Sequence, residues 1–189
     1  MAVNIDWTFI ARLEGAGIRK GYVPNPAASQ SGVTIATGFD LGQRTREEIA
    51  AMDLSPDLKA KLMPYVGLRG RDALGVVAGN PLILGDDEVA AIDRVVRAQF
   101  ATRLAVVYDG AIDGETESEK FEDLPGVVQT VIASVAYQYG LNLKVRAPRF
   151  WVTLTEQDWS AAVAELRNFG DAYATRRTAE ANLLATAIA

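Results

Sequence analysis

Apolar residues recur along most of the chain with the period of an α-helix. Asp6 is placed to cap a first helix from about residue 7 to residue 14, and Gly15 and Gly17 would end it. The apolar face of this helix consists of Phe9, Ile10 and Leu13. The first element predicted is therefore a short amphipathic helix.

Residues 18–43 break the helical period. They contain Gly, Pro, Asn and Ser around the alternating segment Val33-Thr34-Ile35, which predicts a small hairpin or a three-stranded sheet. Helical signals resume after it. Thr45-Arg46-Glu47-Glu48 fits a capping box, and Ser55-Pro56 is a cap followed by proline at the first helical position.

The longest predicted helix opens at Asp86 or Asp87. Its inward-facing residues are Val89, Ile92, Val96 and Phe100. Residues 109–123 are rich in Asp and Glu and are interpreted most simply as a solvated acidic loop. Pro125 then begins a helix over 127–139 that is apolar nearly all round, which is typical of the central helix of a bundle.

Two further helices are predicted near the end of the sequence. Thr155 is placed to cap the first, and Gly170 breaks it. Its inward-facing residues are Trp159, Ala162, Val163 and Leu166. The last helix runs through Arg176, Arg177 and Glu180.

Together these elements predict an α+β fold that is mainly α, with 189 residues in one domain. A small N-terminal lobe of about residues 1–60 would hold the hairpin or sheet, and a larger lobe of about 61–189 would be helical. The cleft between two such lobes is a natural ligand site.

Composition narrows the chemistry. The chain has 19 basic and 24 acidic residues and a net charge of -5, which argues against binding nucleic acid or docking on an anionic membrane. It has no Cys and no His, so Cys–His and Ser–His–Asp catalysis and a zinc site built on those residues are excluded. Hydrolysis would have to use carboxylates, hydroxyls or a lysine.

No apolar run approaches the roughly 20 residues of a membrane span, so membrane insertion is not expected. The first residues have no charged stretch followed by an apolar run, unlike a Sec signal peptide. Synthesis in the cytoplasm is expected, with another route to any target outside it.

Glu14 is the first candidate catalytic residue. It follows Ile10 by four residues and ends its helix, so it is expected at the edge of the buried face and at the negative end of the helix dipole. Both positions would favour the protonated carboxyl that a general acid needs. The simpler interpretation is a surface glutamate at a frayed helix end.

Asp40 and Thr34 lie in the glycine-rich segment that follows. Alone, Asp40 is interpreted most simply as a turn former and Thr34 as a strand residue. With Glu14 they could line one cleft, and glycosidases need two carboxyl groups, or one carboxyl group and a positioned water. Arg176 and Arg177 are a basic pair on a solvated helix face, or else one of these arginines reaches Glu14 and orients it. Such an ion pair would favour the charged carboxylate and so lower the pKa of Glu14, against the effects of burial and the helix dipole. The net shift of this pKa therefore stays open.

These residues stand in a pattern similar to the pesticin-type branch of phage lysozymes. The segments that carry the resemblance are Leu13-Glu14-Gly15, Gly21-Tyr22-Val23-Pro24 and Ser31-Gly32-Val33-Thr34-Ile35-Ala36-Thr37-Gly38-Phe39-Asp40-Leu41-Gly42. Weaker similarity continues in Val135-Ala136-Tyr137-Gln138-Tyr139-Gly140, in Trp159-Ser160-Ala161-Ala162-Val163-Ala164-Glu165-Leu166 and in Thr175-Arg176-Arg177-Thr178-Ala179-Glu180.

The resemblance implies a lysozyme-like muramidase that hydrolyses the β-1,4 bond between N-acetylmuramic acid and N-acetylglucosamine. Glu14 would protonate the leaving oxygen, and Asp40 and Thr34 would stabilise the transition state and hold the attacking water. Arg176 would orient Glu14. Gln138 and Tyr22 would contribute to substrate binding, Gln138 at the position of a glutamine that lines the family's cleft.

The chain departs from T-even phage lysozymes, which carry an aspartate nine residues after the catalytic glutamate, where Val23 stands here. The pesticin-type spacing, with an aspartate six residues beyond the threonine, assigns the second carboxylate to Asp40. Inversion or retention would depend on whether the Glu14 and Asp40 carboxyl groups are roughly 6.5–9.5 Å or roughly 5–5.5 Å apart.

Several alternatives stay open from the sequence. The chain could be a catalytically inactive glycan-binding module or a glycosidase for chitin-like polymers. An active muramidase would be a monomer without a cofactor or metal that acts on periplasmic peptidoglycan. It would arrive there after holin-mediated release as a phage endolysin, or by delivery as a bacteriocin or effector. Delivery as a toxin would call for an immunity protein in the producing cell.

Overall fold

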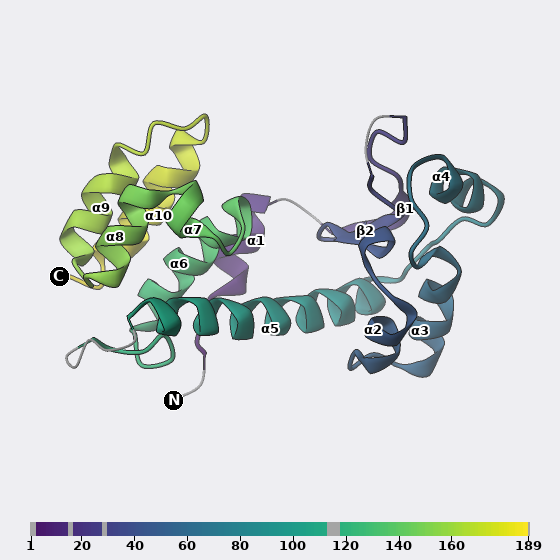
Figure 1. Ribbon diagram of the computed structural model, residues 1–189, viewed down its shortest axis with the longest axis horizontal. Helices are drawn as coiled ribbons and strands as arrows, with labels where there is room; N and C mark the ends of the chain where they lie inside the picture. The colour runs from purple at the N-terminus through teal and green to yellow at the C-terminus, as the bar shows by residue number, and fades with distance from the viewer. Residues whose placement is uncertain (1–2, 15–16, 28–29, 113–117, 189) are drawn as a thin grey trace. The chain divides into compact units, whose positions relative to one another are not determined.

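A computed structural model describes residues 3–14, 17–27, 30–112 and 118–188. The chain divides after Leu13 and again after Gln99 into two compact units. The sheet unit is residues 14–99, and the helical unit is residues 1–13 with 100–189 (Figure 1). The predicted lobes met near residue 60, inside the sheet unit. The division differs because apolar residues between 61 and 99 belong to the core of the sheet unit, and because the N-terminal helix packs with a helix more than 100 residues later. Periodicity alone reveals neither packing.

The sheet unit contains a three-stranded antiparallel sheet in the order β1-β2-β3. The strands are β1 (Ile18–Tyr22), β2 (Thr34–Ala36) and β3 (Phe39–Asp40). This confirms the three-stranded alternative predicted for residues 18–43. The alternation expected around Val33 is absent from the burial pattern, since all residues from 33 to 36 are buried. Other residues of the sheet unit therefore pack against both faces of β2.

Short helices complete the core of the sheet unit: η1 (Leu41–Gln43), α2 (Arg46–Ala51), α3 (Pro56–Leu62), η2 (Met63–Tyr65) and α4 (Gly70–Gly79). Thr45 forms the predicted capping box with Glu48, and Ser55 caps α3. No sequence pattern predicted α4. Its only fully buried side chain is Ala73, so no apolar stripe marked this segment as a helix.

The helix α5 (Asp86–Ala111) is the longest element and begins at the predicted residue. It extends into the segment predicted as an acidic loop, of which residues 113–117 lie outside the described part of the chain. The described remainder is not simply solvated. Phe121 is fully buried, and its backbone N–H donates to Asp109 Oδ1 at 2.8 Å. The acidic side chain here organises the backbone around a buried aromatic ring.

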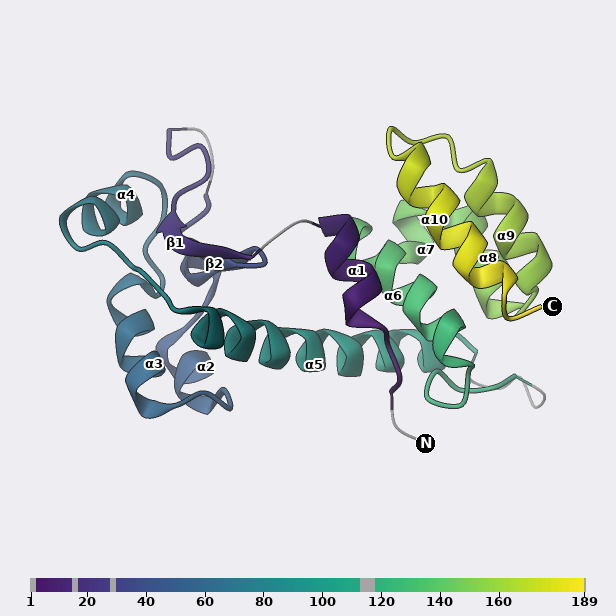
Figure 2. The same cartoon turned by 180° about the vertical axis from the view of Figure 1, so that it is seen from behind.

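The helical unit contains α1 (Trp7–Glu14) as far as Leu13, α6 (Gly126–Tyr139), α7 (Leu143–Arg146), α8 (Pro148–Thr155), α9 (Trp159–Arg167) and α10 (Ala174–Ala185). Every residue from 128 to 136 is buried, which confirms α6 as the predicted central helix. Figures 1 and 2 show α6 inside this unit, with α9 and α10 side by side.

Capping confirms one predicted helix start and corrects another. Asp6 Oδ1 accepts from the backbone N–H groups of Thr8 and Phe9, so it caps α1 as expected. Gly15, expected to end that helix, lies outside the described residues. Thr155 was predicted to cap the helix containing Trp159, but it is the last residue of α8. The cap of α9 is Asp158, whose carboxylate accepts from Ala161 N–H.

The first helix is fixed to the central helix by specific contacts. The backbone N–H of Asn4 donates to Gln129 Oε1 at 2.7 Å, and that of Asp6 donates to Thr130 Oγ1 at 2.9 Å. Trp7 also makes edge-to-face aromatic contacts with Phe100 of α5 and Tyr137 of α6. These contacts hold the helix that ends at Glu14 within the helical unit.

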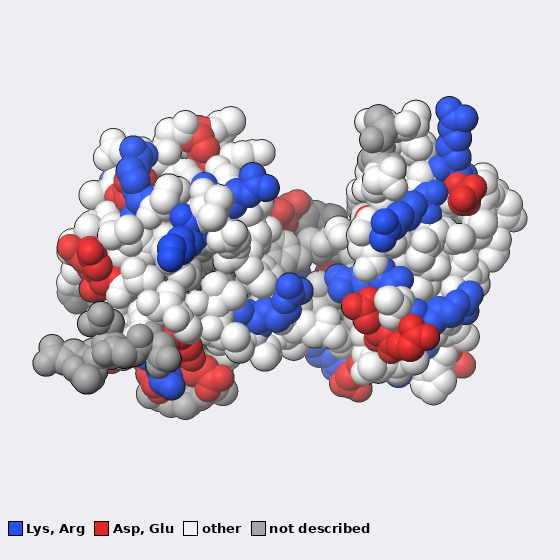
Figure 3. All heavy atoms as spheres, in the orientation of Figure 1, with Lys and Arg blue, Asp and Glu red and all other residues white. Residues whose placement is uncertain are grey.

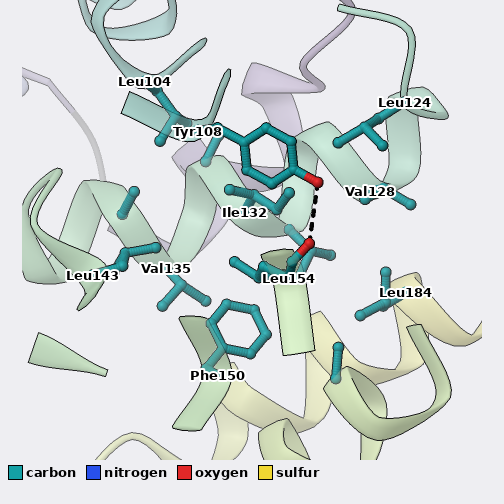
Figure 4. Close-up of a cluster of buried hydrophobic side chains, with 14 of the residues drawn as sticks. Leu104, Tyr108, Leu124, Val128, Ile132, Val135, Leu143, Phe150, Leu154 and Leu184 are labelled. Carbon is teal, nitrogen blue, oxygen red and sulfur yellow. Dashed lines mark hydrogen bonds between the residues drawn. The ribbon is translucent and has the colours of Figure 1, made fainter. Parts of the chain in front are cut away.

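The core of the helical unit contains one tyrosine that lends it a pH dependence. Tyr108 is fully buried, and its hydroxyl donates to Leu154 O at 3.0 Å (Figure 4). Burial raises the pKa of Tyr108 to about 12. Because an unfolded tyrosine ionises near pH 10, the folded state loses stability as pH rises from about 10 towards about 12.

We therefore expect the melting temperature of the wild type to fall more steeply between about pH 10 and 12 than that of Tyr108→Phe, which keeps the ring and cannot titrate. Differential scanning calorimetry across that range tests this. Parallel curves for the two proteins would show that Tyr108 does not govern the alkaline loss of stability.

Candidate functional site

Three of the predicted site residues form one row across the sheet. Tyr22 of β1 is paired with Thr34 of β2, and Thr34 is paired with Asp40 of β3. Directly opposed residues of antiparallel strands project from the same face of a sheet. Tyr22 is exposed, Asp40 is half-buried and Thr34 is buried. The fold thus brings together a phenol, a hydroxyl and a carboxyl from three separate stretches of sequence.

The carboxyl group of Asp40 is held by one of its two oxygens. Oδ1 accepts hydrogen bonds from the backbone N–H groups of Gly32 at 2.9 Å and Gly42 at 2.8 Å, and the second of these caps η1. Oδ2 accepts no hydrogen bond from the described residues. Asp40 therefore forms the turn expected of it and still has one carboxylate oxygen free to accept from a ligand.

The two glycines that hold Asp40 are packed backbone against backbone. A Cβ on Gly32 would collide with the Cα of Gly42 and with the carbonyl oxygen of Leu68. A Cβ on Gly42 would lie 2.6 Å from the Cα of Gly32. Both neighbours are backbone atoms and cannot rotate away. These positions therefore require glycine for close approach rather than for an unusual φ angle.

The Gly32→Ala variant is expected to lower the free energy of unfolding by about 1–3 kcal/mol, because the added methyl group overpacks a rigid contact. Urea denaturation measures this. Gly75→Ala is the control, since a Cβ at this helical position meets nothing within 4 Å and should stabilise α4 by about 0.5–1 kcal/mol. Equal stability of Gly32→Ala and the wild type would contradict the packing described here.

Glu14, the predicted general acid, is the last residue of α1, as expected from the sequence. Its side chain is exposed, so the predicted partial burial is wrong. The helical spacing places Glu14 one turn beyond the buried Ile10, but burial at a helix end depends on what packs there. The position at the helix C-terminus remains the feature that sets Glu14 apart.

Arg176 and Arg177 do not lie on a solvated helix face. The exposed fraction is 8% for Arg176 and 2% for Arg177. Arg176 Nε donates to Glu180 Oε1 at 3.0 Å, and its Nη2 donates to the carbonyl oxygen of Ser134 at 2.9 Å. Ser134 Oγ in turn donates to Glu180 Oε1 at 2.5 Å. The simpler interpretation of this basic pair is therefore wrong.

The guanidinium of Arg177 links α10 to α6 and to the segment that precedes α10. It donates to Asp171 Oδ2 at 2.9 Å, to Glu180 Oε2 and to Gln138 Oε1. The guanidinium carbon of Arg177, Cζ, lies 4.5 Å from the ring centroid of Phe169. Desolvation would lower the pKa of Arg177, but Glu180 and Asp171 raise it by more, so the group stays charged. Gln138, at the end of α6, is thereby oriented by a buried cation.

Asp171 completes this network as a charged acceptor. Desolvation favours its neutral form, but hydrogen bonds from Tyr139 Oη at 2.7 Å, from the backbone N–H of Tyr173 and from Arg177 outweigh it. The pKa of Asp171 is lowered as a result. The buried network therefore balances two arginines against two carboxylates, Asp171 and Glu180.

Glu180 and Asp171 were not predicted from the sequence to be part of a site. Glu180 follows Arg177 by three residues and Arg176 by four, which is the spacing at which side chains of one helix meet. The ion pairs of Glu180 with these arginines could therefore have been predicted from the sequence. Asp171 lies before α10, and no periodicity links it to Tyr139. Only the tertiary structure shows that partnership.

No group of three or more Asp or Glu side chains suited to a metal ion occurs among the described residues. Within the same residues, no helix is long and apolar enough to cross a membrane. In the view of Figure 3, basic and acidic side chains are interspersed over the surface of each unit rather than gathered by sign.

The chain matches a known protein family over most of its length. The family model described as "Pesticin: Bacterial toxin homologue of phage lysozyme, C-term" matches residues 4–160. The chain belongs to the pesticin family. The predicted resemblance and the lysozyme-like, mainly helical fold are both confirmed by this match. A search of curated proteins found no match.

The family match covers five of the six predicted site residues: Glu14, Tyr22, Thr34, Asp40 and Gln138. Arg176 lies beyond it, in α10. As a pesticin-family member, the chain carries a domain homologous to phage lysozyme, a class of peptidoglycan hydrolases.

Proposed function

We propose that this pesticin-family chain is a muramidase, a glycoside hydrolase that cleaves the β-1,4 bond between N-acetylmuramic acid and N-acetylglucosamine in peptidoglycan. The row formed by Tyr22, Thr34 and Asp40 carries the proposal. In it, Asp40, whose Oδ2 accepts no hydrogen bond from the described residues, is directly paired with Thr34 across the sheet. The family match supplies the class of substrate.

The hydrogen bonds of the row suggest how water is held. Thr34 Oγ1 donates to the carbonyl oxygen of Gly32 at 3.4 Å, so its lone pairs can accept a hydrogen bond. Asp40 Oδ2 can accept as well. A water that donates to both oxygens keeps a lone pair for attack on the anomeric carbon, and its proton passes to Asp40 as the new C–O bond forms.

Glu14 is assigned the opposite role of general acid. It gives its proton to the glycosidic oxygen as the bond between that oxygen and the anomeric carbon breaks. Arg176 orients Glu14, Gln138 binds the glycan, and the exposed ring of Tyr22 packs against a sugar face.

The proposed setting follows from the substrate. Peptidoglycan of the periplasm is the target, reached after holin-mediated release or by delivery as a toxin effector. The protein acts as a monomer, and a producer that delivers it as a toxin is protected by an immunity protein.

Digestion of purified Gram-negative sacculi, with mass spectrometry of the soluble products, tests the activity. Muropeptides that end in reducing N-acetylmuramic acid are expected. Parallel digestion of chitin oligomers separates a muramidase from a chitin-type glycosidase. Saturable binding to sacculi without release of reducing ends would overturn the proposal and identify a glycan-binding module instead.

A further inference from the structure

The turn between β2 and β3 is bound by a carboxylate from a distant helix. Asp93, on α5, accepts a hydrogen bond at Oδ1 from the backbone N–H of Thr37 at 3.1 Å. Its Oδ2 accepts from the hydroxyl of the same threonine at 2.8 Å. Both oxygens of one carboxylate are thus used on one turn residue. Arg97 Nη2, one helical turn later, lies 3.8 Å from Asp93 Oδ2.

The hairpin that contains this turn is short. β2 has three residues and β3 has two, so few ladder hydrogen bonds hold the hairpin, and a short hairpin alone is marginally stable. The residues on either side of Thr37 both have positive φ angles, 53° at Ala36 and 82° at Gly38. For Ala36 this conformation costs about 1–2 kcal/mol, so an external contact must hold it.

The same part of α5 also contacts the start of β1. A Cβ on Gly17 would lie 2.9 Å from Val89 Cγ1 and 3.6 Å from Thr37 Oγ1. Gly17 therefore packs closely against Val89 and Thr37. The first turns of α5 thus contact both the residue before β1 and the turn between β2 and β3.

We propose that Asp93 is a positioning residue for the hairpin that carries the proposed water-binding pair. Thr37 lies three residues after Thr34 and three before Asp40, so a shift of the turn moves both strands. Asp93 acts by holding Thr37 and does not touch the substrate. This inference rests on the muramidase function proposed above.

Three variants test the role. Asp93→Ala removes both acceptors and is expected to lower kcat about 10- to 100-fold with little change in KM, because misplacement by about 1 Å can cost that much. Asp93→Asn can still accept from Thr37 N–H and can donate to its hydroxyl, and we expect kcat within about 3-fold of the wild type. Asp87→Ala removes an exposed carboxylate from the same helix and should match the wild type.

Amide hydrogen exchange tests the contact between Asp93 and Thr37 in a way that does not depend on enzymatic activity. Protection of Thr37 N–H should fall in Asp93→Ala and persist in Asp93→Asn, while amides of α3 stay as protected as in the wild type. An active wild type with equally active Asp93→Ala would overturn the positioning role alone. Sacculi left intact by the wild type would overturn the muramidase proposal, whereas the exchange result would still stand. Unchanged Thr37 protection in Asp93→Ala would refute the contact itself.

Discussion

The Glu14→Gln variant is expected to fold like the wild type and to release no measurable muropeptides from sacculi. Glutamine keeps the size of the side chain and its exposed position at the end of α1, but it cannot give up a proton to the leaving oxygen. General acid catalysis contributes about 10²- to 10⁴-fold to rate, so kcat should fall by at least about 10²-fold. Release of reducing ends measures the loss, and circular dichroism shows whether the fold is kept.

A matched control separates the chemistry from loss of a surface charge. Glu156 is also an exposed glutamate at a helix C-terminus, that of α8, and it is outside the proposed site. Glu156→Gln should therefore retain wild-type kcat. If Glu14→Gln were fully active with an intact fold, Glu14 would not be the general acid and the roles given to Thr34 and Asp40 would lose their partner.

The second large effect is expected on stability. Glu180 is fully buried and is the carboxylate shared by Arg176 and Arg177. Glu180→Gln keeps the volume and removes the charge, which leaves both guanidinium groups without their common counter-ion. Breaking a buried ion pair on one side costs about 3–5 kcal/mol. For a chain of this size the melting temperature should fall by roughly 6–20 °C.

Urea denaturation with an unchanged m-value checks this prediction. Glu165→Gln is the control, because Glu165 pairs with Arg149, whose side chain is 71% exposed. An exposed pair contributes about 0–1 kcal/mol. If Glu180→Gln cost no more than this control, the buried arginines would draw their stability from other partners.

Local features of the fold could be predicted because they depend on residues close in sequence. Asp6, Thr45 and Ser55 cap helices where their side chains reach N–H groups two or three residues ahead. The continuous apolar run through α6 predicted a buried central helix. The glycine-rich segment predicted a sheet, and its pattern of Thr34 and Asp40 led to the family that the comparison then confirmed.

Other predictions failed where local preference was weak or competed. Thr155 and Asp158 are both good capping residues three positions apart, and the sequence did not say which would be used. The last helix showed two adjacent arginines that looked solvated. Their burial depends on acceptors from α6 and from the segment before α10, which meet them only in the folded helical unit.

What the sequence by itself determined were the helices with strong caps or periodicity, the small sheet, and the residue types able to act on a glycan. The tertiary structure alone decided that Tyr22, Thr34 and Asp40 stand in one row, that Gly32 and Gly42 fix one oxygen of Asp40, and that Asp93 holds the hairpin turn from α5. The physical reason is that strand register and long-range hydrogen bonds join residues that are distant in sequence, 56 positions apart for Thr37 and Asp93, and no local pattern encodes such partners.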